Sequence, residues 1–408
     1  MQSTVVSGQS AGRTAMPARL YYLDWLRVIA IMGVFLFHAV HPFDLNDWHI
    51  KNEELSMAVT VVLGLFFPWG MPFFFLIAGT GSWFALRRRS GRQFVGERVR
   101  RLLIPYIAGT ILLWPPMLYF QWRHIIERGL WAGSFLDFVL IHRAGFSPMW
   151  FGEVGFHLWF LGFLFSFSVL GLPIFLWLKG KSGQAALARL AGFCRHRGGI
   201  LVFILPLVAV RLLLQPFFPQ EHDWADFFVL MALFVCGFVL YAHEGFAAAI
   251  KRDWLLLLVG GIVTSAGWAY LALTTQDLHI EAPARTARQL LIWVFITANA
   301  WCWSAFMLYV GIRFLDFTSK RLVYAQEAVL PFFLLHQPVI IAIAYFVVQW
   351  DMGVFPKLVT VVVASFLVTV ALYELVIRRV GLLRTLFGMK APPAAPARPA
   401  FSSGMKND

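Results

Sequence analysis

Apolar runs close to 20 residues long recur along almost the whole of this 408-residue chain. A helix of about 20 apolar residues crosses the roughly 30 Å of hydrocarbon in a lipid bilayer. The recurrence therefore predicts an all-α fold, a polytopic integral membrane helix bundle of about ten transmembrane helices. The apolar runs lie at residues 21–41, 57–86, 102–121, 156–178, 200–218, 226–243, 254–273, 289–312, 323–349 and 357–377.

Composition agrees with a membrane protein and leaves no stretch for a soluble domain. Hydrophobic residues make up 60% of the chain and charged residues only 13%, whereas a soluble domain carries about 25% charged residues. We expect one integral membrane domain over residues 20–390. Polar and small residues in 1–19 and a Pro- and Ala-rich stretch in 391–408 predict disordered cytoplasmic segments at either side.

Basic residues cluster in every second segment between the runs, and the formal net charge is +13. Lys and Arg beside spans normally mark cytoplasmic loops, so both termini are predicted to be cytoplasmic. This placement favours the lipid bilayer or an anionic substrate as the partner, and not nucleic acid. The basic segments are 87–101, 179–197, 251–252, 313–321 and the part from Arg378 onward.

One segment, residues 122–155, breaks this alternation because it is basic on the side expected to be external. Its apolar runs 130–140 and 146–151 are too short to span a bilayer, and they predict a re-entrant or interfacial helix. The cysteines Cys194, Cys236 and Cys302 are far apart, and the chain has no C-x-x-C or H-E-x-x-H motif. Neither a disulfide framework, a metal site nor a bound cofactor is predicted.

The first span carries Asp24, Arg27 and His38. Ionisable groups are costly in lipid and therefore mark candidate functional sites. At 100° per residue, Arg27 and His38 lie within ~20° of one helix face and about 16 Å apart along the axis. Asp24 lies three residues before Arg27 and can pair with it. The stripe predicts chemistry inside the bilayer; the alternative is a structural ion pair and a histidine bonded to a neighbouring helix.

Arg98 and Arg101 share a face at the start of the third span, in GERVRRLLIPY. Guanidinium groups at a helix N-terminus make a good phosphate site, although arginines also flank spans for topology alone. The ninth span holds Glu327, His336 and Gln337. It also contains two prolines, Pro331 and Pro338, which predict an irregular helix lining a cavity. A structural or substrate-binding role is favoured for His336 over a catalytic one.

Two further charges in spans call for partners. The first is Glu374 in the last span, and a salt bridge to Arg378, four residues later, is the simplest account of it. Arg211 interrupts the fifth span, and the sequence does not identify its partner.

Several sequence landmarks resemble the membrane acyltransferase-3 superfamily. They are D-W-L-R at 24–27 with His38, MPFFFLIAGTGSW (71–83), the R-x-x-R of Arg98 and Arg101, HLWFL (157–161), PFFLLHQPVI (331–340) and YELVIRRVGLLRTLFG (373–388). The later landmarks look most like the subgroup labelled glucan biosynthesis protein C, which succinylates periplasmic glucans. One departure is visible: where the family often has Ser-Gly-Phe, this chain has Ala78-Gly79-Thr80, so a hydroxyl is missing at position 78 unless Thr80 replaces it.

The resemblance implies transfer of an acyl group, acetyl or succinyl, from cytoplasmic acyl-CoA to a hydroxyl of a carbohydrate such as a periplasmic glucan, polysaccharide or glycolipid. It implies that Arg98 and Arg101 bind the phosphates of acyl-CoA as co-substrate. His38 would act as general base or as a transient acyl carrier, with Asp24 holding Arg27 in place. Lining residues for the acceptor or thioester are then His336, Gln337, His157, Trp159 and Glu327.

Two other classes of function remain open at this point. Proline-broken helices and intramembrane His and Arg also suit a transporter or flippase without covalent chemistry, although no inverted repeat is evident. A lipid-binding or scaffolding membrane protein would use the same charges only to fix helix packing.

Overall fold

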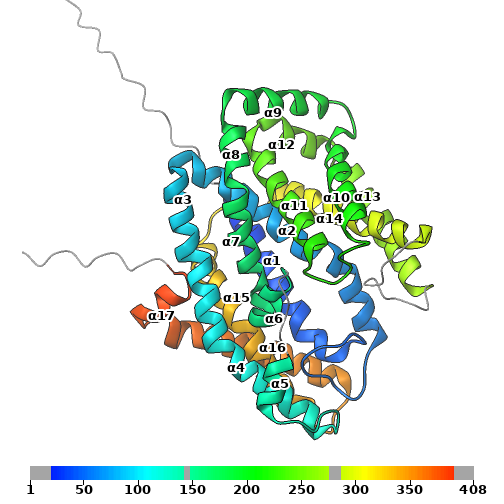
Figure 1. Cartoon of the computed structure of the whole chain (residues 1–408), viewed down its shortest axis with the longest axis vertical. Coiled ribbons are helices and arrows are strands. Elements are labelled where there is room, and N and C mark those ends of the chain that lie inside the picture. Colours follow the sequence, from blue (N-terminus) through cyan, green and yellow to red (C-terminus); the bar gives the residue numbers. More distant parts are fainter. Residues whose placement is uncertain (1–19, 142–147, 275–285, 390–408) are drawn as a thin grey trace, which may run out of the picture.

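The computed structural model describes residues 20–141, 148–274 and 286–389, and every regular element in these ranges is a helix, as predicted. Figure 1 shows the helices gathered into one bundle, with α9 lying across the end of α8. The predicted terminal segments 1–19 and 391–408 fall outside the described residues.

Within the described ranges, eight helices are long and apolar enough to cross a membrane. They are Tyr21–Phe43 (α1, Tyr21–Val40, continued by η1, His41–Phe43), α2 (Met57–Arg88), Gly91–Glu127 (α3, Gly91–Arg98; η2, Val99–Leu103; α4, Ile104–Glu127), α11 (Trp224–Ala242), α13 (Trp254–Leu273), α14 (Ala287–Phe314), α15 (Lys320–Val347) and Val354–Ile377 (α16, Val354–Leu372; η5, Tyr373–Ile377).

The other two predicted spans are helical but differ from a straight span. The run 156–178 forms η3 (Phe156–Leu158), α7 (Trp159–Leu170) and α8 (Leu172–Lys179), with a bend of 47° between α7 and α8. The run 200–218 gives a shorter apolar helix, Gly199–Leu214 (η4, Gly199–Phe203; α10, Ile204–Leu214). Pro216 has no N–H with which to continue the hydrogen bonds of α10. Among the described residues, eight helices are therefore long and apolar enough to span a membrane, or nine if the bent pair is one span, in agreement with the predicted polytopic bundle of about ten helices.

Shorter helices occupy the connections. Segment 122–155 contains α5 (Phe135–Ile141) and α6 (Trp150–Gly155), as its short apolar runs suggested, although 142–147 are outside the described residues. The remaining short helices are α9 (Lys181–Phe193), α12 (Glu244–Arg252) and α17 (Gly381–Leu386).

Contacts between distant segments define two ends of the bundle. At one end, Tyr22 and Tyr241 hydroxyls are 2.7 Å apart, and Lys179 Nζ donates to the Leu86 carbonyl at 2.6 Å. We call this the basic end, because the Lys- and Arg-rich segments gather here. At the opposite end, Lys357 Nζ donates to Asn52 Oδ1 at 3.0 Å. The alternation of segments therefore separates the two ends as predicted, while the cytoplasmic placement of the basic end stays a prediction.

The charges noted within spans have partners in the bundle. Arg211 on α10 donates to Asp226 on α11 at 2.7 Å and to Gln215 at 2.6 Å. Glu374 and Arg378 are 3.1 Å apart, which confirms the predicted salt bridge. Ion pairing is what the cost of a lone charge in hydrocarbon requires.

Helices α2 and α11 approach each other most closely at two glycines. A Cβ added to Gly79 would lie 1.9 Å from the Phe234 carbonyl oxygen, and one added to Gly237 would lie 1.9 Å from the Leu76 carbonyl oxygen. Small residues of this kind let membrane helices pack backbone to backbone. The glycine of the Ala-Gly-Thr motif therefore serves helix packing.

Gly79→Ala should lower the free energy of unfolding by about 2 kcal/mol, because the added methyl overpacks the α2–α11 contact. The measurement is the apparent unfolding midpoint in detergent. Gly64→Ala is the matched control, since a Cβ there on the same helix meets nothing within 4 Å. Equal midpoints for the two variants would contradict this account of the packing.

Candidate functional site

The predicted pair at the start of α1 is present. Arg27 Nη1 lies 3.0 Å from Asp24 Oδ1. The Arg27 guanidinium reaches α2, where its Nη2 lies 3.2 Å from the position that a Cβ on Gly81 would take. The ion pair thus sits at the basic end, and His38 lies about 16 Å further along the same helix.

His38 lies in a group of rings at the other end of α1. Its ring centroid is 5.4 Å from that of His336 on α15 and 6.3 Å from that of Trp48, which stacks on it. His336 is in turn 5.2 Å from His157. We call His38, His157 and His336 the histidine centre. The sequence placed these residues in three different spans, and the fold brings them together.

His157 is bonded to a carbonyl that a proline leaves open. In an α-helix the N–H of residue 338 would bond the Leu334 carbonyl, but Pro338 has no N–H. His157 Nε2 lies 3.1 Å from that oxygen instead. Because a carbonyl oxygen only accepts, His157 carries a proton on Nε2.

The same reasoning assigns the proton of His336. Its Nδ1 is 2.6 Å from the Phe333 carbonyl oxygen, so Nδ1 donates. In their neutral forms, His157 and His336 therefore leave Nδ1 and Nε2, respectively, as acceptors. Both of these atoms, and His38 Nδ1, are buried without a hydrogen-bond partner among the described residues.

A loop held by hydrogen bonds between distant segments contacts this centre at the end of the bundle opposite the basic one. We call residues 44–56 the cap loop. Lys51 Nζ donates to the Asp44 carboxylate and to the backbone carbonyl of His41, and Asn52 accepts from the buried Lys357. These bonds hold Trp48 over the centre, where its ring stacks at 5° on His41 with centroids 5.5 Å apart.

Gln337 follows His336 on α15 and contacts the cap loop. Its Nε2 is 3.0 Å from His49 Nε2. The His49 Nδ1 is in turn 2.8 Å from Gln121 Oε1 on α4. The Gln337 side chain is buried, and its Oε1 has no hydrogen-bond partner among the described residues.

At the basic end, Arg98 and Arg101 differ in their surroundings. Arg98 Nη2 donates to Ser82 Oγ on α2 at 3.1 Å, and its guanidinium lies over the Phe94 ring. Arg101 is 40% exposed and pairs with Glu97 at 3.6 Å. Arg98 immediately precedes η2 and Arg101 lies within it; η2 is a π-helical turn of a kind often found at functional sites. A Cβ on Gly81 would touch Arg27, so Arg27 and the Ser82–Arg98 contact lie side by side.

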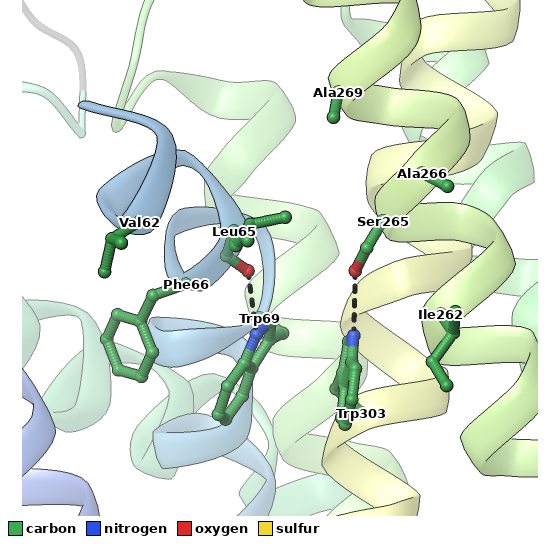
Figure 2. A pocket seen from close by; sticks show the side chains of 9 residues that line it. All are labelled: Val62, Leu65, Phe66, Trp69, Ile262, Ser265, Ala266, Ala269 and Trp303. Carbon is green, nitrogen blue, oxygen red and sulfur yellow. Dashed lines mark hydrogen bonds between the residues drawn. The ribbon is translucent and has the colours of Figure 1, made fainter. Parts of the chain in front are cut away.

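A cavity of about 510 Å³ lies elsewhere, between α2 and the α13–α14 pair. Figure 2 shows the indoles of Trp69 and Trp303 there, bonded to the Leu65 carbonyl and to Ser265. These polar groups are already bonded within the protein, and the walls between them are apolar. The cavity lies among membrane spans and suits lipid hydrocarbon better than a polar substrate.

Comparison with known proteins identifies the family. A family model described as an acyltransferase domain, acyltransferase-3, matches residues 20–374. The chain belongs to this family. Proteins named Glucans biosynthesis protein C from Salmonella paratyphi A and Salmonella agona are each 22% identical over 399 residues, covering 95% of this chain and 100% of the relative. No solved structure matches.

The resemblance noted in the sequence is thereby confirmed, and the protein is a multi-pass membrane acyltransferase. Membership in this family favours an acyltransferase over the transporter and scaffolding alternatives. It does not by itself assign a donor, an acceptor or a role to any histidine of the centre.

The departure from the family pattern lies at Ala78, two residues before Thr80. The Thr80 hydroxyl is fully buried and donates to the Ile77 carbonyl at 2.7 Å, within its own helix. The nearby hydroxyl that contacts an arginine of the acyltransferase is that of Ser82. The sequence offered no signal for Ser82 beyond its place in the landmark.

Two residues predicted to line the pocket have other neighbours in the structure. Glu327 is at the basic end, 3.4 Å from Arg384 and 3.6 Å from Arg378, and about 13 Å along α15 from His336. Trp159 packs on His222, with ring centroids 4.0 Å apart. His222 precedes α11, and its burial lowers its pKa to about 4, so it is neutral at physiological pH.

The centre of the acyltransferase does not have the arrangement of a metal site. Among the residues that the structure describes, no group of three or more His, Cys, Asp or Glu side chains is placed to hold a metal ion. The ring nitrogens that are bonded to backbone carbonyls in His157 and His336 already have partners, and the chemistry of the centre rests on the remaining nitrogens.

Asp44→Asn should lower the free energy of unfolding by about 1–3 kcal/mol at neutral pH, because it removes charge-assisted bonds that hold the cap loop. Burial alone would raise the Asp44 pKa, but the hydrogen bonds from His41 and Lys51 take it below the ordinary 3.8. A depressed pKa contributes stability that is present above 3.8 and lost as the pH falls through the folded value.

The measurement is the apparent unfolding midpoint of wild type and Asp44→Asn in detergent. Their difference should be full at pH 7 and should shrink below about pH 4. Asp47→Asn, on an exposed carboxylate of the same loop, should leave the midpoint unchanged. A difference that is independent of pH would contradict the assignment to the ionised Asp44.

Proposed function

We propose that this acyltransferase moves an acyl group, acetyl or succinyl, from cytoplasmic acyl-CoA to a hydroxyl of a carbohydrate at the periplasmic face of the bacterial inner membrane. The observation that carries the proposal is the pairing of two sites along α1. An arginine site lies at the basic end, and a centre of unpartnered buried histidine nitrogens lies about 16 Å away along the helix.

The basic end suits the donor. Arg98 and the neighbouring Arg27 and Arg101 supply guanidinium groups where acyl-CoA carries its phosphates. Arg98 Nε is buried and has no hydrogen-bond partner among the described residues. Lys- and Arg-rich segments face the cytoplasm in most membrane proteins, which is where acyl-CoA is found. The pantetheine arm would then run along α1 toward His38.

The histidine centre suits a carbohydrate acceptor. The atoms left open there are acceptors: imidazole nitrogens of His157 and His336 and the Gln337 carbonyl oxygen. A ligand that satisfies several buried acceptors must bring several donors, which is what the hydroxyls of a sugar do. The relatives named Glucans biosynthesis protein C make a glucan a reasonable acceptor for this chain.

In the proposed reaction His38 is the general base. Its imidazole takes the proton of the acceptor hydroxyl, and the oxygen attacks the thioester carbonyl carbon. The C–S bond then breaks, and the departing CoA thiolate takes the proton from the His38 imidazolium. Asp24 and Arg27 position the start of α1 and the donor phosphates. Trp48 and the cap loop cover the centre and reduce the access of water, which would otherwise compete as acceptor.

The alternative use of His38 is as an acyl carrier, in which its nitrogen attacks the thioester first and the acyl-imidazole then reacts with the acceptor. The two routes differ in what happens without acceptor. An acyl carrier releases one equivalent of CoA in a burst, whereas a general base releases CoA only at the rate of hydrolysis.

His38→Gln should lower kcat by about 10²–10⁴-fold, the usual contribution of a general base. Purified wild type and variant would be assayed with acetyl-CoA or succinyl-CoA and a glucan, with free CoA and acylated glucan as the readouts. His196→Gln is the control, because His196 is an exposed histidine between α9 and η4. Undiminished transfer by His38→Gln would remove His38 from the reaction, and a stoichiometric burst in wild type would assign the acyl-carrier route.

Arg98→Gln should raise the KM for acyl-CoA about 10–100-fold while changing the KM for the glucan little, because charge-assisted bonds to phosphate are lost. Arg101→Gln should act in the same direction, and the exposed Arg92 on α3 provides the control Arg92→Gln. Acyl-pantetheine, which lacks the nucleotide phosphates, should be used equally well by wild type and Arg98→Gln. Equal effects on both substrates would contradict the phosphate assignment.

A further inference from the structure

The side chain of Gln337 is held by a chain of hydrogen bonds that leads out of the histidine centre. Gln337 is 2% exposed. Its Nε2 contacts His49 Nε2 at 3.0 Å, and His49 Nδ1 contacts Gln121 Oε1 at 2.8 Å. The three residues come from α15, the cap loop and α4, so the chain joins three separate parts of the fold.

The donors and acceptors in this chain fit only one arrangement of protons. An amide nitrogen has no lone pair to accept with, so Gln337 Nε2 donates and His49 Nε2 accepts. Neutral His49 then carries its proton on Nδ1, which donates to Gln121 Oε1. The two contacts therefore agree on a single tautomer of His49. The Gln337 carbonyl oxygen is left as an acceptor, buried and without a partner among the described residues.

His49 is itself firmly placed. Its ring packs edge-on against Phe156, with centroids 4.8 Å apart, and against Trp48 at 5.2 Å. Phe156 has a φ of 47°, a strained value for a bulky residue. The His49 ring is thus packed against two aromatic rings and bonded between Gln121 and Gln337.

We propose that Gln121 and His49 are positioning residues, which turn the Gln337 carbonyl oxygen toward the acceptor so that it accepts a hydrogen bond from a sugar hydroxyl beside the one that reacts. This inference rests on the proposed transfer to a carbohydrate. His336 Nε2 on the adjacent residue supplies a second acceptor. Two fixed acceptors on one turn of α15 suit two neighbouring hydroxyls of a sugar ring, and thereby set which hydroxyl meets His38.

The test uses variants that keep side-chain size and lose the hydrogen bonds: Gln121→Met, His49→Phe and Gln337→Met. Each should lower kcat/KM for the glucan about tenfold, the effect of about one hydrogen bond, and leave the KM for acyl-CoA within about twofold. Gln349→Met is the control, on an exposed glutamine of the same chain region after α15. It should behave as wild type.

Coupling between the sites separates positioning from a merely structural role. In this proposal His49 acts on the acceptor through Gln337, so the double variant His49→Phe/Gln337→Met should be no slower than Gln337→Met alone. The proposal is overturned if the losses of kcat/KM in the two single variants multiply in the double variant. It is also overturned if the variants are impaired equally toward glucan and acyl-CoA, or if no single variant loses kcat/KM for the glucan. Wild type that transfers no acyl group to any glucan would instead contradict the proposed function itself.

A conservative variant tests the direction of the chain. Gln121→Glu keeps an oxygen that accepts from His49 Nδ1, so at pH 8.5 it should retain kcat/KM for the glucan within about threefold. Gln121→Met should not. If Gln121→Glu is as impaired as Gln121→Met while its unfolding midpoint is unchanged, His49 is not held as the Nδ1–H tautomer and the proposal fails.

Discussion

The geometry of the histidine centre depends on one hydrogen bond that α15 cannot make within itself. Pro338 leaves the Leu334 carbonyl without its usual backbone donor, in a part of the bundle where an unbonded carbonyl is costly. His157 supplies the missing donor from η3. This single contact fixes the ring of His157 against α15 and determines its tautomer. A proline that would weaken an isolated helix thus brings two histidines from distant parts of the chain within 5.2 Å of each other.

Much of the architecture followed from the sequence because hydrocarbon permits few solutions. The ten apolar runs all form helices, and the Asp24–Arg27 pair and the Glu374–Arg378 bridge follow from three- and four-residue spacing. Other contacts could not be predicted in this way. Spacing along one helix does not say which side chains a neighbouring segment presents to it, so the sequence did not indicate that Glu327 pairs with Arg384 at the basic end.

The cap loop was beyond sequence reasoning for a different reason. Residues 44–56 have no periodicity and read as a mixed, acidic connection, yet they contribute Trp48 and His49 to the centre. Their placement comes from Lys51, Asn52 and the buried Lys357, which bond across segments far apart in sequence. Such contacts form only in the folded chain, and no local sequence pattern predicts them.

Charge is distributed along the bundle in a way that matches the cost of burying it. The guanidinium and carboxylate groups described at the basic end are bonded to one another or to hydroxyls, and their ion pairs are partly exposed. The histidine centre, further along the bundle, holds polar groups that need carry no charge: imidazoles and a primary amide. A carboxylate or ammonium base there would have to be paired or would cost several kcal/mol to bury. Neutral imidazole avoids that cost and still accepts a proton, and this is the physical reason to seek the base of this acyltransferase among His38 and its neighbours and not among its carboxylates.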